Sequence, residues 1–207
     1  MIVPCTAVMI LVAAGASAAD SPAGHYVLRG VHEVGSEILL KPDGKFEFAL
    51  AYGAADFEAS GTWKVDGDAV VLTTDGLDEP AFELAHSAAS QEKGVRVHVK
   101  GTAGHPAAGL DVVLRTESGD LFAGTDEQGV AAFEPKSAIK AAYFRVRMYD
   151  YQAGPFPLNP AHNQFEFTIH SAVISRVPFR GERLKINGKT LEMRFFDPKQ
   201  TMNYEKQ

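Results

Sequence analysis

Apolar and polar residues alternate along most of this chain with a period of two, and this pattern constrains the fold more than any other feature. Period two is typical of β-strands that bury one face, whereas a helix would repeat about every 3.6 residues. In one run, Phe46, Phe48, Leu50 and Tyr52 fall on the same strand face. No long amphipathic helix is indicated anywhere in the chain. The sequence therefore predicts an all-β protein.

Tight turns separate the alternating runs in the first third of the chain. Asp43-Gly44 and Asp66-Gly67 each lie between two runs, and such pairs favour hairpins because glycine accepts a positive φ without steric cost. We expect residues 20–88 to form an antiparallel meander or a small barrel. The run from Val34 to Leu40, the Pro-Asp-Gly turn and the run from Phe46 to Tyr52 resemble the strand rhythm of small lipocalin-like barrels. Residues 80–93 lack alternation and are interpreted as a connection.

The middle of the chain, residues 93–150, contains a second set of alternating runs. Within it, Val95–Phe133 carries a strand, the segment GHPAAGLDVVL, a Ser-Gly turn and the segment TDEQGVAAF. These features resemble a transthyretin-like or carboxypeptidase-regulatory-type Ig-like module. The resemblance implies a β-sandwich fold. Modules of this family are usually accessory domains for folding, spacing or binding, and the fold itself implies very little about function. Residues 149–163 are proline-rich and are interpreted as a loop.

The last segment, residues 163–207, is predicted to contain further strands and a hairpin at Asn187-Gly188. These strands could complete the middle sandwich, or they could return to the N-terminal meander and close it. We favour the second arrangement, which makes the N-terminal domain discontinuous, because a few meander strands alone leave two open edges.

The first residues read as a secretory signal. An apolar run is followed by Ala16-Ser17-Ala18, which supplies the small residues that a signal peptidase requires. We expect residues 1–19 to be removed by cleavage after about Ala18 or Ala19, which places the protein in the periplasm or outside the cell. The mature chain then contains no cysteine, because Cys5 is the only one and lies in the signal. We also expect no transmembrane segment in it, because no further stretch is long and apolar enough. Its stability must come from burial without disulfides.

The charge of the chain limits its partners. The formal net charge is −6, and no cluster of lysine and arginine is evident. Binding to nucleic acid needs such clusters, so nucleic acid is not expected as a partner.

One aromatic strand face is the best candidate for a ligand site. Phe46, Phe48, Tyr52 and Trp63 are assigned to it as ligand-binding residues. If these side chains enclose space, they form a pocket for a small apolar ligand; if they interdigitate, they form an ordinary core. A core is the default for an aromatic stripe. A second candidate is the strand around Tyr143, where Arg145 and Arg147 could face an anionic or glycan ligand, or could belong to an ordinary solvated face.

Catalytic and metal sites are not indicated. His98-Val99 and Gly104-His105-Pro106-Ala107 are similar to segments of 5-hydroxyisourate hydrolase, and that resemblance implies a hydrolase only if His98 and His170 converge on one cleft. His162, Glu166 and His170 are interpreted as parts of a solvated face, not as metal ligands, because no convergence of ligands is visible. No cofactor is expected.

Together these features predict an exported, non-catalytic binding or interaction protein of the bacterial cell envelope. Its partner would be another protein or a small apolar ligand. A hydrolase related to 5-hydroxyisourate hydrolase, or a carrier of a small apolar ligand in the N-terminal meander, are the alternatives.

Overall fold

The computed structural model describes residues 21–196 and 199–207. The predicted signal peptide, residues 1–19, lies outside the described residues. The regular secondary structure of the described chain is almost entirely β-strand, with only two short helical turns, η1 (Arg147–Tyr149) and α1 (Ser171–Ile174). The predicted all-β class is therefore confirmed.

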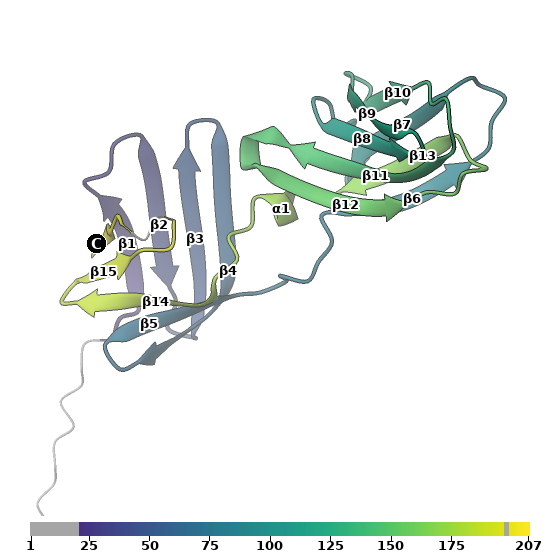
Figure 1. Ribbon diagram of the computed structural model, residues 1–207. Helices are drawn as coiled ribbons and strands as arrows, with labels where there is room; N and C mark the ends of the chain where they lie inside the picture. Colours follow the sequence, from purple (N-terminus) through teal and green to yellow (C-terminus); the bar gives the residue numbers. More distant parts are fainter. Residues whose placement is uncertain (1–20, 197–198) are drawn as a thin grey trace, which may run out of the picture.

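Eight antiparallel strands close into a barrel in which each strand pairs with its neighbours around the ring (Figure 1). In chain order these strands are β1 (Gly24–Arg29), β2 (Val34–Leu40), β3 (Lys45–Tyr52), β4 (Ala55–Asp66), β5 (Ala69–Thr74), β14 (Arg180–Asn187), β15 (Thr190–Met193) and β16 (Met202–Lys206). The first and last strands of the chain pair directly, with Leu28 opposite Tyr204. The C-terminal hairpin thus completes the N-terminal meander, which is the arrangement that the open-edge argument favours.

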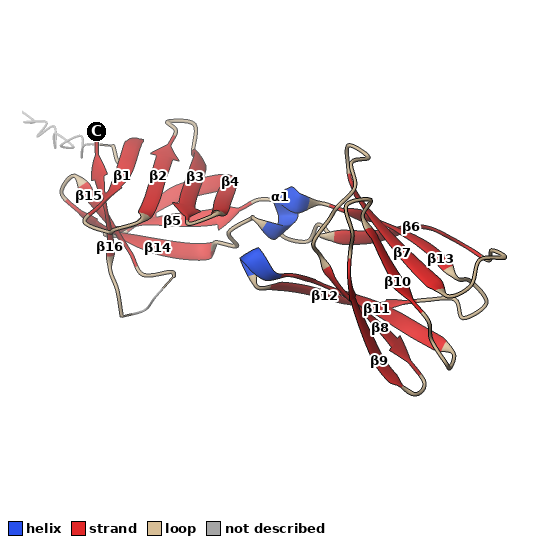
Figure 2. Ribbon diagram, turned by 90° about the horizontal axis from the view of Figure 1, so that it is seen from above, coloured by secondary structure: helices blue, strands red, loops and turns tan. Residues whose placement is uncertain are grey.

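The other strands form two four-stranded sheets that face each other in a sandwich inserted between β5 and β14 (Figure 2). The first sheet has the order β10 (Val130–Phe133), β7 (Val95–Gly101), β13 (Gln164–Ile169), β6 (Phe82–Ala88). The second has the order β12 (Tyr151–Pro157), β11 (Ile139–Val146), β8 (Asp111–Thr116), β9 (Gly119–Gly124).

Three segments differ from the expectations drawn from the sequence. Strand β6 belongs to the sandwich and lies within residues 80–93, which were interpreted as a connection. The sequence predicts that β13 belongs with the C-terminal strands, but it lies between β6 and β7, parallel to β7. A parallel pairing joins residues far apart in sequence, and periodicity alone does not reveal it. Residues 151–157 form β12 and not a loop; its prolines are tolerated because β12 is an edge strand with an irregular register opposite Ala142 and Phe144.

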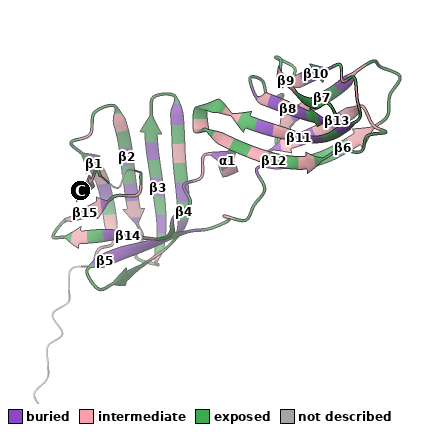
Figure 3. Cartoon of the chain, viewed as in Figure 1, coloured by how far each residue is buried: buried purple, intermediate pink, exposed green. Residues whose placement is uncertain are grey.

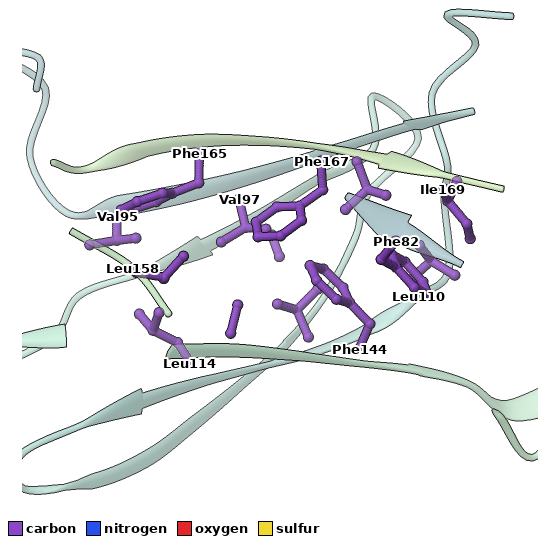
Figure 4. Close-up of a cluster of buried hydrophobic side chains, with 14 of the residues drawn as sticks. Phe82, Val95, Val97, Leu110, Leu114, Phe144, Leu158, Phe165, Phe167 and Ile169 are labelled. Carbon is purple, nitrogen blue, oxygen red and sulfur yellow. The ribbon is translucent and has the colours of Figure 1, made fainter. Parts of the chain in front are cut away.

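Each unit has a separate apolar core (Figure 3). In the sandwich the core is aromatic, and Figure 4 shows Phe82, Phe144 and Phe167 between the two sheets. The rings of Phe82 and Phe144 stack with centroids 4.5 Å apart, and the ring of Phe167 meets Phe144 edge-on at 4.7 Å. Aromatic pairs of this geometry add to the stabilisation that burial provides.

The barrel core depends on a residue that belongs to no strand. Phe179 precedes β14 and is fully buried. Its ring lies 5.1 Å from the ring of Phe48, 5.0 Å from that of Phe195 and 6.0 Å from that of Phe46, measured between centroids. Phe179 therefore packs between β3 and the segment that follows β15, and so connects the N-terminal and C-terminal parts of the barrel.

A buried polar pair supports the barrel elsewhere. The hydroxyl groups of Ser36 and Tyr204 lie 2.9 Å apart, and the Ser36 hydroxyl donates to the carbonyl oxygen of Ala49. Burial raises the pKa of the Tyr204 phenol to about 12. The bonds satisfy both hydroxyls inside the apolar interior, where an unpaired hydroxyl would be costly.

We expect Phe179→Ala to lower the free energy of unfolding of the barrel by about 3–5 kcal/mol, because the substitution leaves a cavity among three aromatic rings. Trp63 is the only tryptophan and lies in the barrel, so its fluorescence during urea unfolding reports on this unit. Tyr52→Ala removes an aromatic ring that is 59% exposed and serves as the control. Equal, small effects of the two substitutions would contradict the packing role of Phe179.

Candidate functional site at the barrel mouth

The four predicted ligand-binding residues do not surround one cavity. Phe46 and Phe48 are buried and pack against Phe179, so their rings interdigitate with the core. Trp63 is half-buried, and its indole Nε1 donates to the carbonyl oxygen of Lys41 at 2.8 Å. Tyr52 is largely exposed at the end of β3. Of the two alternatives that the sequence left open for this face, the packing of Phe46 and Phe48 corresponds to a core.

A different pocket forms where the sandwich meets one end of the barrel. The chain returns from the sandwich through residues 175–179, which run alongside β4 and β5. The amide of Glu58 donates to the carbonyl of Ser175 at 3.1 Å, and the amide of Val177 donates to the carbonyl of Glu58 at 2.8 Å. The Thr74 hydroxyl donates to the carbonyl of Val177 at 2.9 Å. These bonds fix the returning segment against the barrel wall.

The pocket has a volume of about 370 Å³ and is bounded by residues of both units. Five aromatic residues contribute to its walls: Phe57, Tyr149, Tyr151, Phe195 and Phe196. Phe57 comes from β4 and Tyr149 from η1, and their rings meet edge-on with centroids 5.3 Å apart. The tip of the β11–β12 hairpin thus reaches the upper end of β4 (Figure 1). Ligand pockets commonly form at such boundaries between units, and this volume lies within their usual range.

Two guanidinium groups and one carboxylate supply the charge of the pocket. Arg176 donates to the Glu79 carboxylate at 2.9 Å and to the carbonyl oxygen of Gly76, and its side chain is only 20% exposed. Arg180 also lines the pocket and is exposed, and within the described chain its guanidinium group has no hydrogen bond or ion pair. The Arg176–Glu79 pair is neutral as a whole, so Arg180 leaves the rim with one positive charge.

The described lining contains no serine, cysteine, histidine or aspartate. Its aromatic walls suit apolar groups, and the free guanidinium suits a carboxylate or another anion. The arrangement can bind and orient an apolar molecule that carries one negative charge.

The histidines that a hydrolase would require do not converge. His98 Nε2 lies 2.9 Å from the carbonyl oxygen of Gln128. His98 is opposite Glu166 in the β7–β13 register, so His170 is four residues farther along. That offset corresponds to about 13 Å along a strand. The hydrolase interpretation requires His98 and His170 to converge on one cleft, and this geometry does not bring them together.

The residues considered as metal ligands have other partners. Glu166 accepts from Lys100 Nζ at 2.7 Å, and this bond lowers the pKa of the Glu166 carboxyl. His162 bonds to the Ser87 hydroxyl at 2.9 Å, and His170 Nε2 lies 3.5 Å from the Glu83 carboxylate. Residues 21–196 and 199–207 contain no group of three or more potential ligands able to hold a metal ion.

Comparison with protein-family models, curated proteins and solved structures finds no match to this chain. Within the part of the chain that the structure describes, no helix has the length and apolar character needed to span a membrane. The geometry of the pocket is therefore the main guide to function.

Sequence periodicity does not predict this pocket, because its residues come from distant segments. Phe57 and Tyr149 are 92 positions apart, and Phe195 follows after another 46. Only the aromatic content of residues 149–156 signalled this region, and that stretch was interpreted as a loop.

A carboxylate near this end of the barrel has an unusual environment. Glu182 lies on β14 opposite Leu72, on the same strand face as the buried Leu184, and burial raises the pKa of its carboxyl above the ordinary value of 4.5. No hydrogen bond or ion pair compensates this burial within the described residues. The folded protein therefore holds the Glu182 proton more tightly than the unfolded chain does.

We expect Glu182→Gln to raise the free energy of unfolding near neutral pH. A raised carboxyl pKa means that stability is lost as pH rises from the unfolded value through the folded one, and glutamine removes this loss. The advantage of the variant should disappear below about pH 4, where both states of the wild type are protonated. Urea unfolding followed by Trp63 fluorescence measures the difference, with Glu117→Gln, an exposed carboxylate of the sandwich, as control. A variant less stable than the wild type at neutral pH would contradict the account.

Proposed function

We propose that this protein is an exported, non-catalytic binding protein of the bacterial cell envelope that holds a small apolar ligand with one anionic group at the barrel mouth. The observation that carries the proposal is the aromatic pocket of about 370 Å³ with an unpaired Arg180 at its rim. This site differs from the pocket that the sequence allowed, as an alternative to a packed core, around Phe46 and Phe48.

The chemistry of the pocket supports binding without catalysis. Its described polar groups are guanidiniums, the carboxylate of Glu79 and the tyrosines, and the Glu79 carboxylate is engaged by Arg176. An enzyme of hydrolase type needs an activated nucleophile or water and a base aligned with it. The separation of His98 and His170 also favours binding over the hydrolase alternative.

The sandwich has a defined part in this proposal. Its hairpin tip supplies Tyr149 and Tyr151, which form one wall of the pocket, while the barrel supplies Phe57 and Phe195. The resemblance of Val95–Phe133 to transthyretin-like modules fits an accessory domain of this kind. Export is supported by the apolar run and the Ala16-Ser17-Ala18 site in the sequence.

We expect decanoic acid to bind saturably, with one molecule per chain, when the purified protein is titrated by isothermal calorimetry. Tyr149→Ala should weaken this binding at least about fivefold, because it removes an aromatic wall. Arg180→Gln should weaken decanoic acid about three- to fivefold and leave 1-decanol unchanged, because an exposed charge pair contributes at most about 1 kcal/mol.

Arg29→Gln is the matched control, since Arg29 is an arginine on the barrel with its own partner, Glu205. It should leave both affinities unchanged. The proposal is wrong if decanoic acid gives no saturable heat, or if Tyr149→Ala binds it as tightly as the wild type does.

A further inference from the structure

The outer face of the second sandwich sheet carries aromatic side chains that the barrel-mouth pocket does not use. Tyr143 on β11 lies opposite Val113 on β8, which in turn lies opposite Phe122 on β9. The three side chains therefore form one row across the sheet. Phe122 is 77% exposed, the highest value among the large apolar residues described as exposed. An isolated exposed phenylalanine needs no explanation, but a row that includes a second aromatic ring is a potential contact surface.

A depression lies beside the aromatic row, and two glycines form part of its lining. This depression of about 780 Å³ is lined by Phe122, Val113 and Tyr143 together with Gly124 and Gly154. At Gly154 an added Cβ would come within 3.0 Å of Tyr143 Cδ1 and 2.9 Å of the Ala142 carbonyl oxygen. Because Gly154 has no Cβ, the Tyr143 ring can lie close against the backbone of β12. A larger residue at position 154 would displace the ring.

Charged side chains flank the row in pairs. Arg115 binds Asp120 with two bonds of 2.9 Å, and it also donates to the Tyr143 hydroxyl at 2.6 Å. The remaining pairs on this face are Arg147–Asp111 and Arg145–Asp150. Each arginine is matched by one aspartate, so these six side chains together carry no net charge. Bidentate pairs hold their planar groups in a fixed orientation.

The balance of positive and negative charge on this face distinguishes between a polyanion, a protein and a sugar chain as its ligand. A polyanion or a nucleic acid would need an excess of positive charge, which this face lacks. Aromatic residues and arginine are enriched at protein interfaces, but aspartate is depleted from them, and the three aspartates of this face weigh against a protein partner. A sugar chain fits: the apolar C–H face of a pyranose ring packs on an exposed aromatic ring, and its hydroxyls both donate and accept hydrogen bonds. Paired aspartate and arginine groups offer both acceptors and donors.

We propose that the face formed by Phe122, Tyr143 and their flanking Arg–Asp pairs binds a neutral polysaccharide chain. The site is separate from the barrel-mouth pocket and does not depend on it. For an envelope protein, such a face would hold the molecule on a glycan while the pocket remains free.

The test is isothermal calorimetry of the whole protein with cellohexaose, maltohexaose and chitohexaose. We expect at least one of these neutral hexasaccharides to bind saturably. Phe122→Ala and Tyr143→Ala should each weaken that binding about tenfold, as expected for the loss of one aromatic contact. Leu84→Ala, which removes an exposed apolar side chain from the other sheet, should leave it unchanged.

Phe122→Ala should keep the wild-type melting temperature because the ring is exposed, so loss of binding in this variant cannot be ascribed to unfolding. It should also bind decanoic acid normally, which separates this proposal from the pocket. Absence of saturable binding to all three sugars, or equal binding by Phe122→Ala and the wild type, would overturn the proposal. Phe122-dependent self-association in place of sugar binding would likewise overturn it and indicate a protein interface.

Discussion

The burial of Phe179 is the interaction on which the rest of the structure depends. The chain leaves the barrel after Thr74 and returns 105 residues later at Phe179, whose amide donates to the Thr74 hydroxyl at 3.1 Å. The Thr74 amide in turn donates to the Phe179 carbonyl at 2.8 Å. These bonds bring the two ends of the insertion together, and the ring of Phe179 then packs between Phe48 and Phe195. Loop-closure entropy opposes such a return, so burial and backbone bonding must offset it.

The same junction creates the candidate site. Because residues 175–179 are bonded to β4 and β5, the hairpin tip of the sandwich is held near Phe57, and Tyr149 packs on that ring. The barrel interior is filled by its own side chains, as the size of an eight-stranded barrel allows. Space for a ligand therefore lies at the mouth between the two units. In this arrangement the closed barrel provides stability, and the proposed binding surfaces include residues of the sandwich.

Much of the fold follows from local sequence signals, and most of the site does not. The alternation at Phe46 and Phe48 and the turns at Gly44 and Gly188 predict strands and hairpins, because side-chain period and positive φ are local properties. The parallel pairing of β7 with β13 and the meeting of Phe57 with Tyr149 depend on distant segments, and periodicity carries no information about them. Proline at position 155 favours a loop over a central strand, but proline is also compatible with an edge strand, and sequence alone does not show that β12 lies at an edge.

The central claim is that strands from both ends of the chain close one barrel around Phe179. Hydrogen–deuterium exchange of the whole protein, followed for individual amides, tests it most directly. The account predicts that interior amides of β1, β5, β14 and β16 exchange as slowly as those of β3, because each of these strands has a neighbour on both sides. Fast exchange along β1 and β5, with slow exchange confined to β2, β3 and β4, would show an open sheet and contradict the account.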